Sequence, residues 1–222
     1  TPLYSSAASD VYKRQGCFMH SNVTRLVLDK GLTEIPRLAF GDCVFLQAFK
    51  IPSSVRHIGE SAFRQTLGLD GVTFEVKKEE DEDSQGLWIG SRAFEKSSIA
   101  NLRIDRKVVF NFKSVSTCLD LVDVSIARPC MMGSGCFSNC KRLKKVHVPQ
   151  VVVLGPSAFH NCYEIPGINL PRSLRVVGDA CFRNCRALAN LQDGKVVKKE
   201  IVTFLLIAQR LKDDIYLNDF VC

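Results

Sequence analysis

Hydrophobic and polar positions along this chain recur with a period of about 22 residues. The clearest unit, Leu154–Leu170, contains an apolar residue, Gly, two variable residues, Ala-Phe, two more variable residues, Cys, and then three spaced apolar residues. Aligning the units on this Phe gives anchors spaced by 22, 23, 31, 21, 22, 22 and 23 residues. The anchors are Phe18, Phe40, Phe63, Phe94, Val115, Phe137, Phe159 and Phe182. A fixed period of this length indicates a solenoid of stacked repeats.

Two apolar stretches in each unit predict two strands. In Leu143–Val148 and Ile165–Leu170 the last three positions alternate between apolar and polar, as a strand with one buried face requires. Pro149 and Pro171 follow these stretches, and Pro ends a strand because it has no N–H for the ladder. A shorter apolar pair, as in Val55–Ile58, leads to the Gly. We therefore expect each unit to contain a strand, a turn, a short strand, a Gly bend and a helical turn carrying the anchor.

This unit resembles the BspA-like leucine-rich repeat of the treponemal type, whose core is apolar-Gly-x-x-Ala-Phe-x-x-Cys/Asn. The resemblance covers about residues 16–193, and Val115 in place of Phe is its main departure. It implies a leucine-rich-repeat solenoid, curved and right-handed, with about eight repeats of 21–23 residues built from short parallel β-strands and helical turns. It also implies a non-enzymatic protein that binds host proteins or other cells at the cell surface.

Two segments before the C-terminus depart from the repeat. Ser5–Gln15 resembles the translation of a sequencing-library adapter, so we expect residues 1–15 to be a non-native leader, which fold reasoning must exclude. A native tail rich in small residues is the alternative. The solenoid then covers residues 16–193. Residues 77–86 fill the one long spacing, and their unbroken charge run favours a solvated acidic loop over a cation-binding loop.

The last segment, residues 194–222, also leaves the pattern. Five apolar residues in it are spaced as one face of a helix: Ile201, Phe204, Leu205, Ala208 and Leu211. We expect this helix to cover the open end of the last coil, and a non-repeat tail of out-of-frame or intronic sequence is the alternative. The apolar run Ile201–Ala208 is shorter than the roughly 20 residues that cross a bilayer, so we expect no membrane span in this segment.

The ten cysteines mostly follow the repeat. Eight occupy two slots, directly before the anchor or three residues after it, where other units have Ala, Ser or Thr. They are Cys17, Cys136 and Cys181 in the first slot, and Cys43, Cys118, Cys140, Cys162 and Cys185 in the second. We expect buried free thiols that pack in the core. Disulfides and a metal site are the alternatives, although structural zinc sites favour tighter spacing and partnering His residues.

The charge is unevenly distributed. The chain carries a formal net charge of +7, and residues 137–186 contain eight cations against two anions. This half could present a basic face to an acidic protein, a glycan sulfate or a phosphate-rich surface, or it could consist of ordinary solvated turns. The aromatic residues sit at anchor positions, where they cannot interleave with cations to stack on bases, so we expect no nucleic acid partner.

The sequence contains no recognisable catalytic motif. The four histidines, His20, His57, His147 and His160, lie in different repeats, and the glycines are repeat bends rather than a phosphate-binding loop. We therefore expect no catalytic residues, no cofactor and no metal. One modification motif is present, because Asn22-Val23-Thr24 is an N-glycosylation triplet.

The outward positions of a solenoid repeat as regularly as the buried ones. The residue between the last two apolar strand positions forms a varied, mostly polar column that begins at Val27. We predict that a partner binds to this column and its basic neighbours: Lys50, Thr73, Arg103, Ser125, His147, Asn169 and Gln192, with Lys144 and Lys145. A wetted sheet face without a partner is the alternative.

The expected function is protein binding or adhesion by a monomer, with a protein partner that is acidic or a cell-surface ligand. An intracellular scaffold and the recognition arm of a larger enzyme are alternatives. The resemblance favours the cell surface, and the cytoplasm is the other candidate location.

Overall fold

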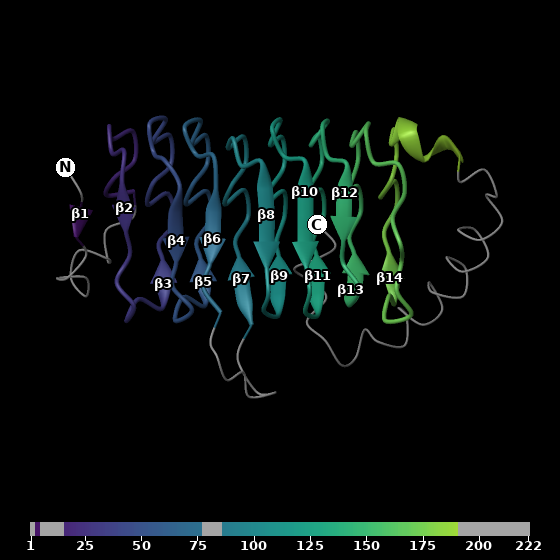
Figure 1. The fold of residues 1–222 in the computed structure, drawn as a ribbon, viewed down its shortest axis with the longest axis horizontal. Helices are drawn as coiled ribbons and strands as arrows, with labels where there is room; N and C mark the ends of the chain where they lie inside the picture. The colour runs from purple at the N-terminus through teal and green to yellow at the C-terminus, as the bar shows by residue number, and fades with distance from the viewer. Residues whose placement is uncertain (1–2, 5–15, 77–85, 191–222) are drawn as a thin grey trace.

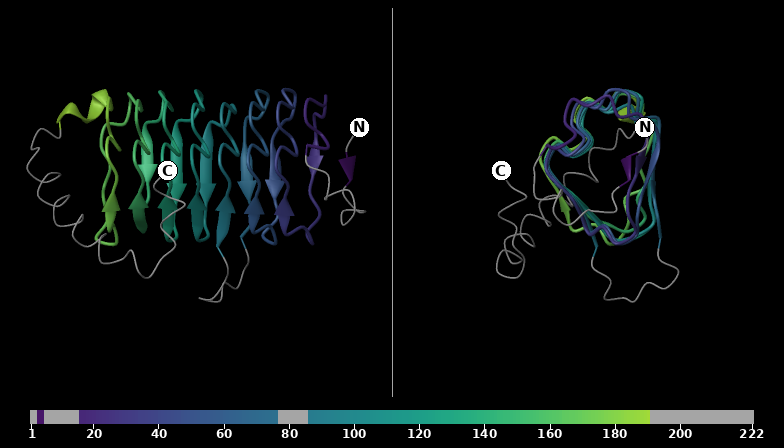
Figure 2. Two further views of the ribbon diagram at one scale, coloured as in Figure 1. Left: turned by 180° about the vertical axis from the view of Figure 1, so that it is seen from behind. Right: turned by 90° about the vertical axis from the view of Figure 1, so that its left-hand side faces the viewer.

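The computed structural model describes residues 3–4, 16–76 and 86–190, and these residues wind as a stack of coils (Figure 1). Five successive coils each contribute one strand to each of two sheets, one of seven strands and one of five. The orders are β14-β13-β11-β9-β7-β5-β3 and β12-β10-β8-β6-β4, and neighbouring strands are parallel throughout. Viewed along the stack, the coils superimpose as one closed outline (Figure 2). The parallel solenoid predicted from the sequence is confirmed.

The strands are short, as the repeat length demands. The five-stranded sheet comprises β4 (Phe49–Ile51), β6 (Val72–Phe74), β8 (Asn101–Ile104), β10 (Asp123–Ile126) and β12 (Lys145–His147). The seven-stranded sheet comprises β3 (Glu34–Ile35), β5 (His57–Ile58), β7 (Leu87–Ile89), β9 (Val108–Phe110), β11 (Cys130–Met132), β13 (Val151–Leu154) and β14 (Val176–Val177). A separate pair is formed by β1 (Leu3–Tyr4) and β2 (Leu26–Val27), and the described part ends in the 3-10 helix η1 (Arg186–Asn190).

Burial alternates along the strands as the pattern predicts. In β4, Phe49 and Ile51 are buried and Lys50 is exposed, and β6 and β8 repeat this alternation in register. Val115 and Cys118 are also fully buried, so the weakest repeat keeps its place in the core. The inward residues of both sheets and the anchors form one continuous hydrophobic cluster. The core is therefore a long stack rather than a globule.

The anchor rings stack along the solenoid axis. Phe40 and Phe63 are stacked with ring centroids 5.4 Å apart, and Phe63 and Phe94 with centroids 5.2 Å apart. Val115 interrupts this stack, and there Phe110 contacts the ring of Phe137 at 5.2 Å with a tilt of 59°. An extra ring from a neighbouring slot thus occupies space beside the missing anchor.

The anchor segment is not the helical turn that the sequence predicted. It is a run of tight turns with one left-handed residue two positions before the anchor and another two positions after it. Around Phe40 these residues are Leu38 (φ 59°) and Asp42 (φ 58°). An α-helix cannot contain this alternation of hands. The Ala-Phe pattern places the ring but does not determine the sign of φ at the flanking residues.

The left-handed residues turn alternate N–H groups toward the next coil. The N–H groups of Leu38, Phe40 and Asp42 donate to the carbonyls of Glu60, Ala62 and Arg64 at 2.9, 2.8 and 2.7 Å. The same three bonds recur between the other successive anchor turns, from the coil of Phe18 to the coil of Phe182. A non-Gly residue in this conformation costs roughly 1–2 kcal/mol, and the ladder of bonds between coils offsets that cost.

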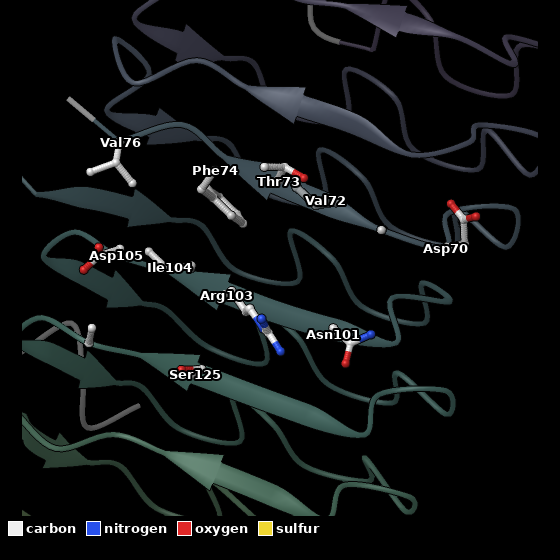
Figure 3. A pocket seen from close by; sticks show the side chains of 12 residues that line it. Asp70, Val72, Thr73, Phe74, Val76, Asn101, Arg103, Ile104, Asp105 and Ser125 are labelled. Carbon is white, nitrogen blue, oxygen red and sulfur yellow. The ribbon is translucent and has the colours of Figure 1, made fainter. Parts of the chain in front are cut away.

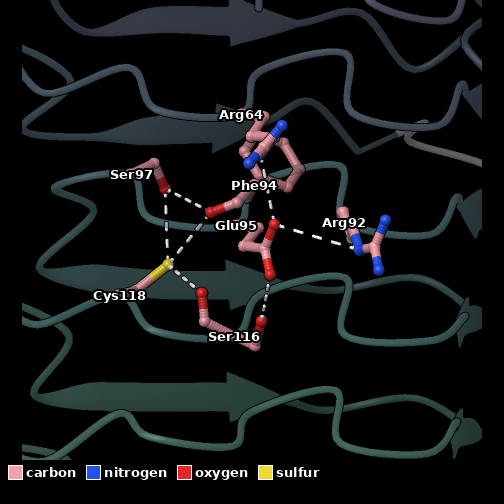
Figure 4. Close-up of polar contacts among 7 residues, drawn as sticks. All are labelled: Arg64, Arg92, Phe94, Glu95, Ser97, Ser116 and Cys118. Carbon is pink, nitrogen blue, oxygen red and sulfur yellow. Dashed lines mark hydrogen bonds and ion pairs between the residues drawn. The ribbon is translucent and has the colours of Figure 1, made fainter. Parts of the chain in front are cut away.

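The slot three residues after the anchor selects a hydrogen-bond donor. The Cys118 thiol donates to the carbonyl of Phe94 in the preceding coil at 3.1 Å, and the Ser97 hydroxyl donates to the same carbonyl at 2.8 Å (Figure 4). The Cys140, Cys162 and Cys185 thiols make the equivalent bond to the preceding coil. These cysteines are buried, as expected, but they do more than fill space.

Cys17 is an exception to the predicted burial. It is exposed, and its anchor Phe18 is only partly buried. Within the described residues, this anchor turn bonds to the following coil alone, through bonds such as Phe18 N–H to the Ala39 carbonyl at 3.1 Å. A coil with one described neighbour has its small-residue slot covered less completely than a coil with two.

The predicted strand Ile165–Leu170 does not form. In the preceding coil, Lys144 N–H donates to the Val122 carbonyl at 2.9 Å, and Pro166 occupies the equivalent position without an N–H. The five-stranded sheet therefore ends at β12. Ile168 still packs against the core but is only partly buried, whereas Leu170 is 43% exposed. Most of the predicted leader, most of the acidic loop and the C-terminal helix lie outside the described residues.

Candidate interaction surface

The predicted binding column is a real row across the five-stranded sheet. The register pairs Lys50 with Thr73, Thr73 with Arg103, Arg103 with Ser125 and Ser125 with His147. The side chains of this row are exposed, except that Ser125 is only partly exposed. Because neighbouring strands lie about 4.8 Å apart, the row is about 19 Å long. The structure thus brings together five of the seven predicted column residues.

The other two column residues do not join this row. Asn169 is exposed but lies outside any strand, because the sheet ends at β12. Gln192 lies outside the described residues. Asn169 therefore does not lie in the row as predicted, because Pro166 has no N–H to continue the sheet beyond β12.

A groove opens in the middle of the row. β6 pairs with β8 only at Val72–Leu102 and Thr73–Arg103, whereas β8 pairs with β10 at four positions. The groove has a volume of about 520 Å³ and runs over β6, β8 and β10, with Arg103 projecting between Thr73 and Ser125 (Figure 3). Its lining also includes Phe74 and Ile104, which are both buried. The sequence indicated the long spacing after β6 but not this opening.

Gly71 leaves one side of the groove without a side chain. It precedes Val72 in the flanking column, where the neighbouring coils have Asn101 and Asp123. A Cβ built on Gly71 would meet only the Ala48 Cβ, at 4.0 Å. A larger side chain at this position would therefore have room to enter the groove.

The charges around the groove are mixed. Arg103 lies 3.7 Å from the Asp123 carboxylate, but its side chain is 76% exposed, so solvent weakens this pair and the guanidinium stays accessible. Asp70 and Asp105 line the two ends of the groove. Lys50 and Lys145 are exposed and have no carboxylate partner among the described residues. Lys144 differs, because its ammonium lies 3.3 Å from Glu164.

A second polar cluster lies on the anchor turns. The Glu95 carboxylate, 13% exposed, is 3.2 Å from Arg64 and 4.0 Å from Arg92, and it accepts a bond from Ser116 at 3.4 Å (Figure 4). These residues come from three successive coils. The cluster joins neighbouring repeats, so we assign it to the structure of the stack.

Most of the buried thiols are poor nucleophiles and poor ligands as they stand. Burial raises the pKa of Cys130 and Cys181 to about 12 and that of Cys185 to about 11. Burial also holds the pKa of Cys136 and Cys140 well above the usual thiol value. A thiol must ionise before it attacks a substrate or binds a metal. Within the part of the chain that the structure describes, no cluster of three His, Cys, Asp or Glu residues could hold a metal ion.

The seven-stranded sheet has a different outer face, which the sequence analysis did not identify. Its outward positions carry Trp88, Val109 and Met131 in direct register, followed by Val152 and Val176. All five are partly exposed. In the sequence, each strand of this sheet from β7 to β13 has an apolar residue at a middle position. That residue did not stand out as an outward position, because its neighbours in the strand are apolar as well.

The family comparison agrees with this architecture. A model described as the BspA type leucine rich repeat region matches residues 13–109, 83–163 and 113–199, with six copies. The chain belongs to the BspA-type leucine-rich repeat family. Leucine-rich repeats of this type are typically non-enzymatic modules for protein interaction or adhesion.

Two solved leucine-rich repeat proteins are similar to this BspA-type chain. A leucine-rich repeat protein from Bacteroides ovatus is 16% identical, with a TM-score of 0.36 and coverage of 78% of this chain and 73% of that protein. A leucine rich cell surface protein from Faecalibacterium prausnitzii is 17% identical, with a TM-score of 0.40 and coverage of 74% and 58%.

A comparison with curated proteins gives no match. Among the described residues of this BspA-type chain, no helix is both long and apolar enough to cross a membrane.

Proposed function

We propose that this BspA-type solenoid is an adhesion module that binds an acidic segment of a protein partner along the outer face of the five-stranded sheet. The observation that carries the proposal is the continuous row from Lys50 to His147 with a groove at its centre. Hydroxyl side chains alternate with longer basic or imidazole side chains along this row, since Thr73 and Ser125 lie between Lys50, Arg103 and His147. A rigid sheet of this kind presents such a row with little loss of conformational entropy on binding.

The spacing of the three longest side chains in the row defines the partner. Lys50, Arg103 and His147 sit on every second strand, so their Cα atoms are about 10 Å apart along the axis. A partner with carboxylates at a matching spacing would contact all three positions, and an apolar side chain could enter the groove beside Phe74 and Ile104. Lys145, which lies in the adjacent column, adds charge beside His147.

The proposal can be tested with a displayed library of random peptides, selected on the intact protein. We expect the selected peptides to be rich in Asp and Glu, and their affinity to fall as salt is added. The double variant Lys50→Ala/Arg103→Ala should weaken their binding by about a hundredfold, roughly tenfold for each lost contact. A matched control, Arg172→Ala/Arg175→Ala, removes the same charge away from this sheet and should bind normally.

A separate variant tests whether the groove takes part in binding. Gly71→Tyr places a large side chain where a Cβ has space, and it should block the selected peptides without changing the unfolding midpoint. Gly167→Tyr is the control, because nothing lies within 4 Å of its Cβ. If the selected peptides are neutral, or bind Lys50→Ala/Arg103→Ala and Gly71→Tyr as tightly as the parent protein, this face is not the binding site.

A further inference from the structure

The two sheets of the solenoid have opposite outer surfaces. The row on the five-stranded sheet is polar, whereas the row on the seven-stranded sheet is apolar over five successive strands, from β7 to β14. We define the apolar row as Trp88, Val109, Met131, Val152 and Val176. Contiguous apolar surface of this kind marks a site that another surface covers.

The apolar row has a definite length and direction. Trp88, Val109 and Met131 are paired directly. The register shifts at β13, where the buried Val153 pairs with both Met131 and Val176, and the partly exposed Val152 precedes it in the chain. Four strand spacings of about 4.8 Å make the row about 19 Å long, parallel to the solenoid axis. Before β7 the same row becomes polar, with His57 and Glu34. The occupant therefore needs an apolar stripe of about this length.

The chain itself contains such a stripe. Thirty-two residues follow Asn190, and seven of the eight residues from Ile201 to Ala208 are apolar. The helical spacing of Ile201, Phe204, Leu205, Ala208 and Leu211 continues to Ile215. At 1.5 Å per residue, a helix over residues 201–215 would be about 21 Å long, close to the length of the row.

The connection is long enough. Residues 191–200 could extend by up to about 33 Å between η1 and the start of the stripe. The apolar row ends at β14, in the last coil before η1, so the segment would turn back along the axis from β14 toward β7.

From these matches we propose that residues 201–215 pack as an amphipathic helix along the apolar row and cover the seven-stranded sheet. This placement differs from a helix that covers the open end of the last coil. It also leaves the five-stranded sheet free, so the polar face remains available to a partner while the apolar face is closed within the chain.

Trp88 reports directly on this contact, because it is the only tryptophan in the chain and lies at the far end of the row. In the full-length protein, Phe204→Asp should release the segment, shift Trp88 emission to longer wavelength and raise its quenching by acrylamide about twofold. Met131→Asp changes a partly exposed residue of the sheet and should have the same effect. Gln209→Asp, outside the stripe, is the control and should leave the emission unchanged.

Comparing the double variant with the two single variants distinguishes a direct contact from a general loosening of the fold. If the segment and the row touch, the double variant Phe204→Asp/Met131→Asp should expose Trp88 no more than either single change does. Additive effects, or no response of Trp88 to Phe204→Asp, would overturn the proposal, and the second result is expected for a helix that covers only the last coil. Emission that depends on protein concentration would instead assign the apolar row to a second copy of the chain.

Discussion

At the residue scale, the slot three residues after the anchor is defined by hydrogen bonding, although its surroundings are apolar. The slot after the anchor accepts Cys, Ser or Thr because each can donate to an anchor carbonyl. Thr66 bonds to Phe63 in its own coil at 2.9 Å, and Cys162 bonds to Phe137 in the preceding coil at 3.2 Å. The sequence predicted small, buried, slightly polar residues here. It did not predict the bond, because Cys, Ser and Thr are equally compatible with simple packing.

The buried thiols predict a loss of stability at alkaline pH. An ordinary thiol pKa is 9.0, and burial raises the pKa of Cys130 and Cys181 to about 12. Between these values the unfolded chain has lost thiol protons that the folded chain keeps, so rising pH favours unfolding. The full contribution is present below pH 9 and is lost as pH rises toward 12, with a slope on the order of 1 kcal/mol per pH unit for each thiol.

Urea unfolding between pH 8 and pH 11 measures this slope. The variant Cys130→Ala/Cys181→Ala removes two of the titrating groups, and Ala already occupies the slot of Cys181 in other repeats. We expect the variant to be less stable at pH 8 but to lose less stability as the pH rises. An identical slope in the two proteins would show that these thiols do not control the alkaline transition.

At the element scale, one coil demonstrates how the core tolerates a lost anchor. Phe110 occupies a slot where other repeats carry Ile, Met, Leu or Val, and its ring is tilted against Phe137 next to the smaller Val115. Val115 and Phe110 together therefore fill the volume that an anchor Phe and a smaller residue fill elsewhere. The sequence shows both departures, but only the structure shows that one compensates for the other.

A double-mutant cycle tests this compensation. Val115→Phe alone should overpack the site and destabilise the protein by roughly 1–3 kcal/mol. Phe110→Ile alone should leave a cavity and have a cost of similar size. Combining them restores the arrangement of the other coils, so we expect a favourable coupling of about 1–3 kcal/mol in urea unfolding. Additive losses would mean that the two side chains occupy separate spaces.

At the scale of the whole molecule, the sequence predicts what repeats and misses what differs between coils. The repeat period predicted the stack, the inward faces and the row from Lys50 to His147. It could do so because a one-residue error in register would turn the buried side chains of a strand to the outer face. The groove lies where the pairing of β6 and β8 ends at Thr73 and Arg103, and the end of the sheet depends on one missing N–H at Pro166. Such local departures carry no periodic signal.

The hydrogen-bond ladder also gives the molecule a direction. Every anchor turn up to the coil of Phe159 donates to the coil that follows, so the turn around Phe182 has no such acceptor among the described residues. At the other end, the equivalent N–H groups around Phe18 are bonded to Arg37, Ala39 and Gly41. The two ends of the stack therefore differ in backbone chemistry, with N–H groups presented at the C-terminal end.

Amide hydrogen exchange should reveal this polarity. The amides of Ala180, Phe182 and Asn184 should exchange at least about a hundredfold faster than those of Leu38, Phe40 and Asp42, because local protection depends on a bonded acceptor. The comparison is internal to one sample, so global stability does not affect it. Equal protection at both ends would mean that carbonyls from residues 191–222 or from a second copy complete the last coil. The helix would then be placed over the end of the stack rather than along the apolar row.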